Sequence, residues 1–276
     1  MSVVLHISDT HFGSEQPAVV EALVQLAHTQ KPDLVVLSGD ITQRARPEQF
    51  SAARQFVDSL AAPALVLPGN HDIALFDLWA RLTRPYARYS AAFGTVLEPV
   101  HQSHDLLVVG VNTTRAARHK HGEVSTAQIE RVARMLSQAT PEQLRIVVVH
   151  QPVAVTRPSD INNLLRGHAP ALAAWAAAGA DLVLGGHIHL PYTLAVHGLA
   201  RPVWAVQAGT AVSTRLRAGM PNSVNLLRWE GAKSMASAAT RPGICRVEQW
   251  DYSEAVAEFL FVKVTELQPS RIRVKS

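Results

Sequence analysis

The sequence has a single cysteine, few charged residues and no long apolar run. Because Cys245 is the only thiol among 276 residues, an internal disulfide and a cysteine-based zinc site are both excluded. We expect Cys245 to be a small buried apolar residue. Only 17% of the residues are charged and 47% are hydrophobic, a balance that supports a large core and argues against disorder.

Two further absences concern membranes and nucleic acids. The longest apolar stretch, residues 169–180, contains Pro170 and Gly179 and is too short to span a bilayer. The first residues lack the basic and apolar regions of a secretory signal, so we expect a cytoplasmic protein with no membrane partner. The net charge of +4 is spread along the chain, and without a basic stripe it argues against a nucleic-acid partner.

The first two-thirds of the chain alternate short apolar runs with helical patterns. This alternation predicts a layered α/β fold, and the nearly continuous apolar runs suit strands covered on both faces. The predicted strands are residues 3–7, 34–37, 64–67, 106–111, 146–149 and 182–184. The predicted helices are residues 17–29, 47–60, 73–93, 126–138 and 169–178.

The last third of the chain has strand patterns and no strong helix. Its predicted strands are residues 203–207, 224–229, 244–251 and 258–264. Residues 231–243 are small and polar, which is typical of a loop tip. Without a linker or an internal repeat, we expect one domain over residues 1–276, strand-rich from about residue 203. An open strand edge there would allow a homo-oligomer.

Residues that bind metals follow five of the predicted strands. Ligands bind beyond the carboxyl ends of strands in open α/β sheets, so these five strand ends can converge on one site. Imidazole, carboxylate and amide donors suit Mn, Fe, Zn, Co or Ni, and are too rich in nitrogen for a dedicated Mg or Ca site. The candidate ligands are Asp9, His11, Asp40, Asn70, His150, His187 and His189.

The spacing and charge of these residues narrow the chemistry. Asp9 and His11 are two residues apart, as are His187 and His189, and side chains at that spacing point the same way in extended backbone. Two divalent ions would contribute four positive charges, whereas the two aspartates contribute only two negative charges. A net positive centre favours an anionic substrate and activates water, as hydrolysis of a phosphate ester requires.

Five ordered blocks resemble the calcineurin-like metallophosphoesterase superfamily. They are Asp9-x-His11, Gly39-Asp40, Gly69-Asn70-His71-Asp72, His150 and Gly186-His187-Ile188-His189. The resemblance covers about the first 211 residues. Within the superfamily the chain is most similar to bacterial class III cyclic-nucleotide phosphodiesterases and glycerophosphodiesterases, a similarity that residues 208–215 and 222–225 share. The implied fold is a four-layer α/β/β/α sandwich with two mixed β-sheets.

The resemblance also implies roles for the matching residues. It implies two divalent or trivalent transition-metal ions: the first held by Asp9, His11 and His189, the second by Asn70, His150 and His187, with Asp40 bridging both. His71 would not bind metal, but would stabilise the transition state or protonate the leaving alkoxide. We expect Asp72 to cap a following helix rather than to orient His71, and His6 to be a core residue.

The function predicted from the sequence is hydrolysis of a small phosphodiester, a cyclic nucleotide or a glycerophosphodiester, by a metal-bridging hydroxide. A phosphomonoesterase is the nearest alternative, because a dianionic monoester commonly recruits an extra cationic clamp. Two less favoured alternatives are a nuclease and a non-catalytic scaffold on the same fold. The sequence leaves open whether cationic side chains near the site grip substrate: Arg115, Arg118, Lys120, Arg215 and Arg217.

Overall fold

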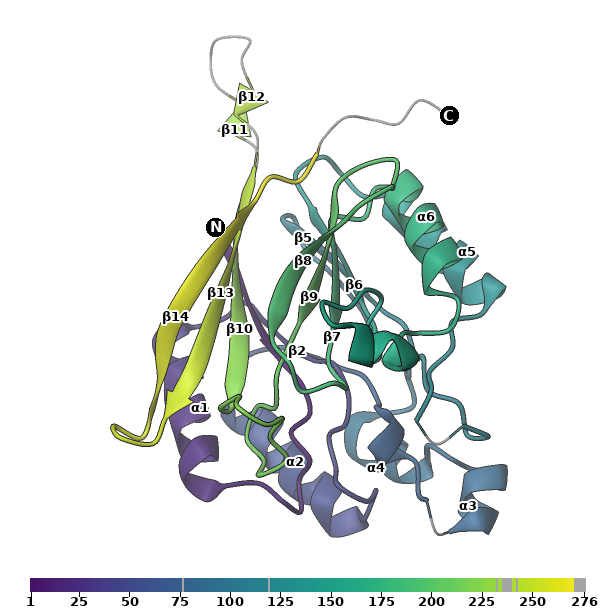
Figure 1. Cartoon of the computed structure of the whole chain (residues 1–276), viewed down its shortest axis with the longest axis vertical. Helices are drawn as coiled ribbons and strands as arrows, with labels where there is room; N and C mark the ends of the chain where they lie inside the picture. Colours follow the sequence, from purple (N-terminus) through teal and green to yellow (C-terminus); the bar gives the residue numbers. More distant parts are fainter. Residues whose placement is uncertain (76, 119, 232, 235–239, 242, 271–276) are drawn as a thin grey trace.

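Two six-stranded mixed β-sheets pack face to face, with helices covering the outer face of each (Figure 1). The computed structural model describes residues 1–270 except 76, 119, 232, 235–239 and 242. Helices α1 (Pro17–Gln30) and α2 (Pro47–Ser59) cover the first sheet, and α5 (Thr126–Ser137) and α6 (His168–Ala178) cover the second. The predicted four-layer α/β/β/α sandwich is confirmed.

The first sheet combines the start and the end of the chain. Its strand order is β14-β13-β10-β1-β2-β3. The parallel part is β1 (Ser2–Ile7), β2 (Leu34–Leu37) and β3 (Ala64–Val66), and the antiparallel part is β10 (Ser223–Glu230), β13 (Ile244–Ser253) and β14 (Glu258–Leu267). The parallel strands therefore all end at the same edge of the sheet.

The second sheet has a parallel centre and antiparallel edges, in the order β4-β5-β6-β7-β9-β8. Its centre consists of β5 (Leu106–Gly110), β6 (Leu144–Val148), β7 (Leu182–Gly185) and β9 (Val203–Gln207). The edge strands are β4 (Val100–Gln102) and β8 (Tyr192–Val196). The sequence patterns did not predict either edge strand.

Two sequence predictions about local structure are wrong. The predicted helix over residues 73–93 is two short helices, α3 (Leu78–Thr83) and α4 (Ala87–Phe93), because Pro85 disfavours helical backbone at the residue before it. The predicted loop over residues 231–243 is wrong at β11 (Lys233–Ser234) and β12 (Thr240–Arg241), which form a two-stranded ladder. Residues 232, 235–239 and 242 of the predicted loop lie outside the described residues. Two 3₁₀ turns, η1 (Asn70–Asp72) and η2 (Pro158–Asn163), lie in loops after strands.

The central strands are largely apolar because both of their faces are buried, with His6 in β1 as one exception. In β1, Leu5 and Ile7 pack in the core beneath α1 and α2, whereas Val4 packs in the core between the sheets. Full burial of such a side chain contributes about 1.5–3 kcal/mol. Cys245 lies in the inter-sheet core as predicted. Among the described helices, none combines the length and the apolar character that crossing a bilayer requires.

Candidate metal centre and active site

The seven candidate ligands come together at the carboxyl ends of β1, β2, β3, β6 and β7. Asp9 follows β1 and Asp40 follows β2, while Asn70 begins the 3₁₀ turn η1 beyond β3. His150 follows β6, and the loop with His187 and His189 follows β7. Because β1–β3 and β6–β7 belong to different sheets, the ligands lie where the ends of the two sheets meet.

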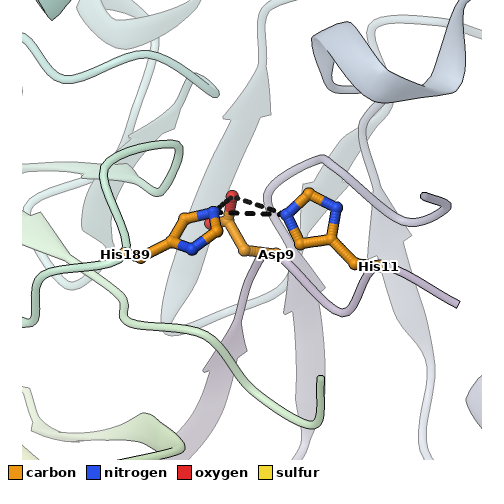
Figure 2. A group of neighbouring side chains, drawn as sticks. All are labelled: Asp9, His11 and His189. Carbon is orange, nitrogen blue, oxygen red and sulfur yellow. Dashed lines mark hydrogen bonds and ion pairs between the residues drawn. The ribbon is translucent and has the colours of Figure 1, made fainter. Parts of the chain in front are cut away.

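The first ligand group is Asp9, His11 and His189, whose side chains converge on one point (Figure 2). The Nε2 atoms of His11 and His189 are 3.2 Å apart. His189 Nε2 lies 3.2 Å from Asp9 Oδ1, and His11 Nε2 lies 3.8 Å from the same oxygen. One ligand atom from each residue lies within 4.8 Å of the others, so the group could hold a single metal ion.

The second ligand group is Asp40, His150 and His187, with Asn70 beside it. His150 Nε2 lies 3.2 Å from Asp40 Oδ1 and 3.2 Å from Asn70 Oδ1. The rings of His150 and His187 meet edge to face, with their centroids 5.1 Å apart. This group supplies imidazole, carboxylate and amide donors, a mixture that suits a transition metal.

Several buried polar atoms in the two groups lack a hydrogen-bond partner. Among the described residues, Asp9 Oδ1 and His187 Nδ1 are buried without one. A buried polar atom left unsatisfied costs about 1–3 kcal/mol, and more if it is charged. Ligation of a metal ion would satisfy such atoms, so the residues present fit a metal centre.

Five of the seven candidate ligands have left-handed backbone, which non-glycine residues rarely adopt. This corrects the expectation that each closely spaced pair lies in extended chain. The φ angles are 54° at Asp9, 44° at His11, 48° at Asp40, 73° at His187 and 55° at His189. Such conformations cost about 1–3 kcal/mol each and gather at functional sites, where the surrounding structure enforces them.

Glycines allow the loops of the site to pack this closely. A Cβ atom on Gly69 would collide with the backbone nitrogen of Asp40, and one on Gly186 would collide with Ser8 Oγ and Asp9 Oδ2. Both positions therefore require glycine, which has no Cβ atom.

Backbone groups orient the ligands. His150 Nδ1 donates to the carbonyl oxygen of Ser38 at 2.9 Å, and His189 Nδ1 donates to that of Arg215 at 2.5 Å. Donation through Nδ1 leaves Nε2 of each ring free for a metal ion. Asp40 Oδ1 in turn accepts from the backbone N–H of His71 at 2.9 Å, which fixes the carboxylate.

The electrostatics keep the carboxylates ionised. Burial alone would raise the pKa of Asp40, but His150 and His71 hold that pKa well below its usual range. Burial alone would lower the pKa of His150, but Asp40 raises it to about 9. Burial lowers the pKa of His187 to about 3. At neutral pH both aspartates are therefore ionised, since against the effect of burial His189 likewise lowers the pKa of Asp9.

His71 lies beside the ligands and lines the cavity above them. Its Nδ1 donates to the carbonyl oxygen of Gln43 at 3.0 Å. The ring packs edge-on against that of His11, with centroids 4.9 Å apart. Its Nε2 lies 3.3 Å from Nη1 of Arg215. His71 is therefore in contact with both a ligand and a cation.

Asp72 has a different role from the expected helix cap. Its carboxylate accepts from the N–H groups of Ile41 at 3.0 Å, Thr42 at 2.8 Å and Gly69 at 2.8 Å. The next helix, α3, is capped by Asp77 instead. The prediction of a cap at Asp72 is wrong, because this side chain ties the loop after Asp40 to the loop before Asn70.

The cavity over the ligands has a volume of about 520 Å³ and includes residues that the sequence did not single out. Asp160 and Asn163 enter it from η2. Arg217 pairs with Asp160 through two contacts of 3.0 and 3.2 Å. Nothing in the spacing of these residues marked them, because an irregular loop after β6 brings them to the site.

The cationic segment after β5 reaches the cavity at one described residue. Arg115 donates to the carbonyl oxygens of Asn112 and Thr114 and to Gln128 Oε1, at 2.8–3.1 Å. Arg118 pairs with Glu123 at 3.0 Å. Lys120 lines the cavity, and residue 119 lies outside the described residues.

Comparison with known proteins identifies the family. Residues 2–191 match the family model described as calcineurin-like phosphoesterase. The chain belongs to this family. A relative is glycerophosphodiester phosphodiesterase GpdQ of Enterobacter lignolyticus, 41% identical over 78 residues, which are 24% of this chain and 28% of that protein. Another, the cAMP/cGMP dual specificity phosphodiesterase MT0825 of Mycobacterium tuberculosis, is 26% identical over 202 residues, 68% of this chain and 61% of that protein.

Both matches span less than two thirds of the relative's own length. A solved structure supports the fold: a dimetal phosphatase from Danio rerio superposes with a TM-score of 0.64 at 12% identity, covering 98% of this chain and 99% of that one. The family and the fold agree with the resemblance found in the sequence.

Proposed function

We propose that this protein hydrolyses a small phosphodiester with two metal ions held by the two ligand groups. The observation that carries the proposal is the arrangement of Asp40, whose carboxylate faces both groups. One oxygen lies 3.2 Å from His150 Nε2, and the other lies 3.9 Å from His11 Nε2. A bridging carboxylate at this position would hold two ions close together, as two-metal phosphoesterase chemistry requires.

The ligand assignment follows from the two groups. Asp9, His11 and His189 would hold one ion, and Asn70, His150 and His187 the other, with Asp40 shared between them. When bound, the ions would neutralise charge on the phosphate and lower the pKa of water. The donor types fit Mn, Fe, Zn, Co or Ni.

His71 is the proposed catalytic residue of the chain itself. Its Nδ1 is occupied by Gln43 O, so Nε2 is the atom that can reach the substrate. From the cavity wall, the imidazolium form of the ring would use its Nε2–H to stabilise charge on the phosphate or to protonate the leaving alkoxide, which would leave the neutral ring with its proton on Nδ1. Its backbone N–H meanwhile holds Asp40 in place.

A small diester is the substrate class we favour. The two relatives reported above are named as phosphodiesterases of a glycerophosphodiester and of cyclic nucleotides, and a cavity of about 520 Å³ is of a size suited to small molecules. The alternative is a phosphomonoester, for which Arg215 and Lys120 in the cavity wall would supply the additional positive charge.

The test is hydrolysis of a matched pair of aryl esters. The protein is loaded with Mn²⁺ and assayed with bis-p-nitrophenyl phosphate and p-nitrophenyl phosphate. Preference for the diester would support the proposal and justify assays with cyclic nucleotides and glycerophosphodiesters. Preference for the monoester would replace it with a phosphatase, and no turnover by metal-loaded protein would contradict both.

A further inference from the structure

We propose that Arg215 binds substrate, its guanidinium holding a non-bridging oxygen of the phosphate ester. This inference rests on the proposed function and adds to it a residue from outside the ligand groups. The main chain of Arg215 is held in place, whereas its guanidinium makes contacts that a phosphate could replace. The guanidinium of the neighbouring Arg217 is instead held by a carboxylate.

The main chain of Arg215 is fixed next to the first ligand group. Its carbonyl oxygen accepts from His189 Nδ1 at 2.5 Å and from Thr210 Oγ1 at 2.8 Å. Its N–H donates to Ser213 Oγ at 3.3 Å. The Cα atom is therefore held in place, whereas none of these bonds involves the guanidinium.

The guanidinium contacts an amide oxygen and a histidine ring at the cavity wall. Its Nη1 lies 3.1 Å from Gln43 Oε1 and 3.3 Å from His71 Nε2. Among the described residues, no carboxylate forms an ion pair with Arg215. Its charge is therefore not paired with a carboxylate, and a phosphate oxygen would be a stronger partner than an amide oxygen or an imidazole ring.

Arg217, two residues further on, provides the contrast. Its guanidinium makes both contacts with the Asp160 carboxylate and also donates to the carbonyl oxygen of Ile188 at 3.2 Å. The charge of Arg217 is thus matched by a carboxylate, and its side chain holds η2 against the loop of His187 and His189. Of the two arginines in the cavity wall, Arg215 is the one available to an anion.

Binding of substrate by Arg215 would also release His71. Nη1 of Arg215 lies 3.3 Å from Nε2 of His71. A phosphate oxygen that draws the guanidinium away would leave Nε2 open to the leaving oxygen of the ester. Arg215 would therefore couple occupancy of the phosphate site to the availability of the catalytic histidine.

The experiment compares Arg215→Ala and Arg215→Lys with wild type, all loaded with Mn²⁺. Arg115→Ala is the matched control, since it removes one half-buried arginine whose guanidinium contacts lie outside the cavity. Three quantities are measured: bound metal per chain, affinity for inorganic phosphate by calorimetry, and kcat/KM for bis-p-nitrophenyl phosphate. The alanine variant keeps the backbone carbonyl that orients His189.

We expect Arg215→Ala to keep its metal while phosphate affinity and kcat/KM each fall about 10- to 100-fold, the range for losing a hydrogen bond between charged groups. Arg215→Lys should recover part of the loss, and Arg115→Ala should match wild type. Phosphate affinity and kcat/KM within twofold of wild type in Arg215→Ala would overturn the inference, as would loss of metal in both Arg215 variants. If wild type binds phosphate through Arg215 but cleaves no ester, the proposed function fails and this inference stands.

Discussion

Asp40 Oδ1 lies 3.2 Å from His150 Nε2, while its Oδ2 lies 3.9 Å from His11 Nε2. A single side chain thus faces a histidine from each ligand group. Asp40 lies in the loop after β2 and has left-handed backbone. In the proposed centre the two groups would share this carboxylate, so a change at Asp40 should affect metal binding at both.

The first prediction concerns Asp40→Asn. The substitution preserves the shape of the side chain but removes the negative charge that both metal ions would share. We therefore expect both ions to bind more weakly and kcat/KM to fall by more than about 100-fold. A fall of about 100-fold is the largest expected from losing a residue that only supports a metal ligand. Metal per chain is measured by mass spectrometry alongside turnover. Asp58→Asn, on the exposed face of α2, is the control. Full metal content and full activity in Asp40→Asn would refute the proposed centre.

The second prediction concerns Asp72→Asn. Asp72 joins the loops that carry Asp40 and Asn70 by accepting from three backbone N–H groups and from Thr42 Oγ1 at 2.7 Å. An amide has one acceptor oxygen instead of two, so we expect the free energy of unfolding to fall by about 1–3 kcal/mol. Urea denaturation measures the change. An unfolding midpoint equal to that of wild type would show that the tie between the loops is unimportant.

The third prediction is a pH dependence of stability that comes from His6. His6 is buried in β1, bonded to Ser38 Oγ at 3.0 Å, and burial lowers its pKa to about 3. The unfolded chain binds a proton at this histidine below about pH 6.5, whereas the folded chain stays neutral. Stability should therefore fall as the pH drops from about 6.5 to 3, by up to about 1.4 kcal/mol per pH unit from this group.

The measurement for His6 is urea denaturation between pH 6 and 4 for wild type and His6→Asn. Other buried histidines add to the slope in both proteins, so the informative quantity is the difference between the two slopes. A shallower slope in His6→Asn is the expected result. Parallel curves would mean that His6 is protonated in the folded state as well.

The fourth prediction concerns removal of metal. Chelation would leave His187 Nδ1 buried without a hydrogen-bond partner, and Asp9 Oδ1 with no closer contact than His189 Nε2 at 3.2 Å. A ligand at 100 times its Kd stabilises a fold by about 2.7 kcal/mol per site, so stripping the metal should lower the melting temperature. The melting temperature is measured by calorimetry before chelation, after chelation and after Mn²⁺ is added back. A melting temperature that is the same in all three samples would indicate that the two ligand groups bind no metal.

The central strands, and the convergence of the candidate ligands, could be predicted because both depend on local sequence. Continuous apolar runs mark strands that are buried on both faces, as in β2, and the polar residues directly after them mark the strand ends. The edge strand β4 has only three residues, too few for a periodic pattern. Likewise, β8 has residues on both faces that are only partly buried, so its pattern is weak.

Other features of the site depend on tertiary contacts that no spacing encodes. Asp160 reaches the cavity because an irregular loop follows β6, and its pairing with Arg217 spans 57 positions of the chain. The contact between Arg215 and His71 spans 144 positions. The left-handed backbone at the ligands is likewise imposed by neighbouring loops, through bonds such as Asp9 N–H to Gly39 O at 3.0 Å.

The left-handed backbone at the candidate ligands lowers the stability of the fold at residues that the proposed activity requires. At His11 and His189, glycine would adopt the same φ without strain but would provide no donor for a metal. Selection for stable folding alone would therefore favour replacing these histidines, and each replacement would dismantle the centre. A design program that optimises thermal stability would be drawn to the same positions, so they should be held fixed when the chain is engineered.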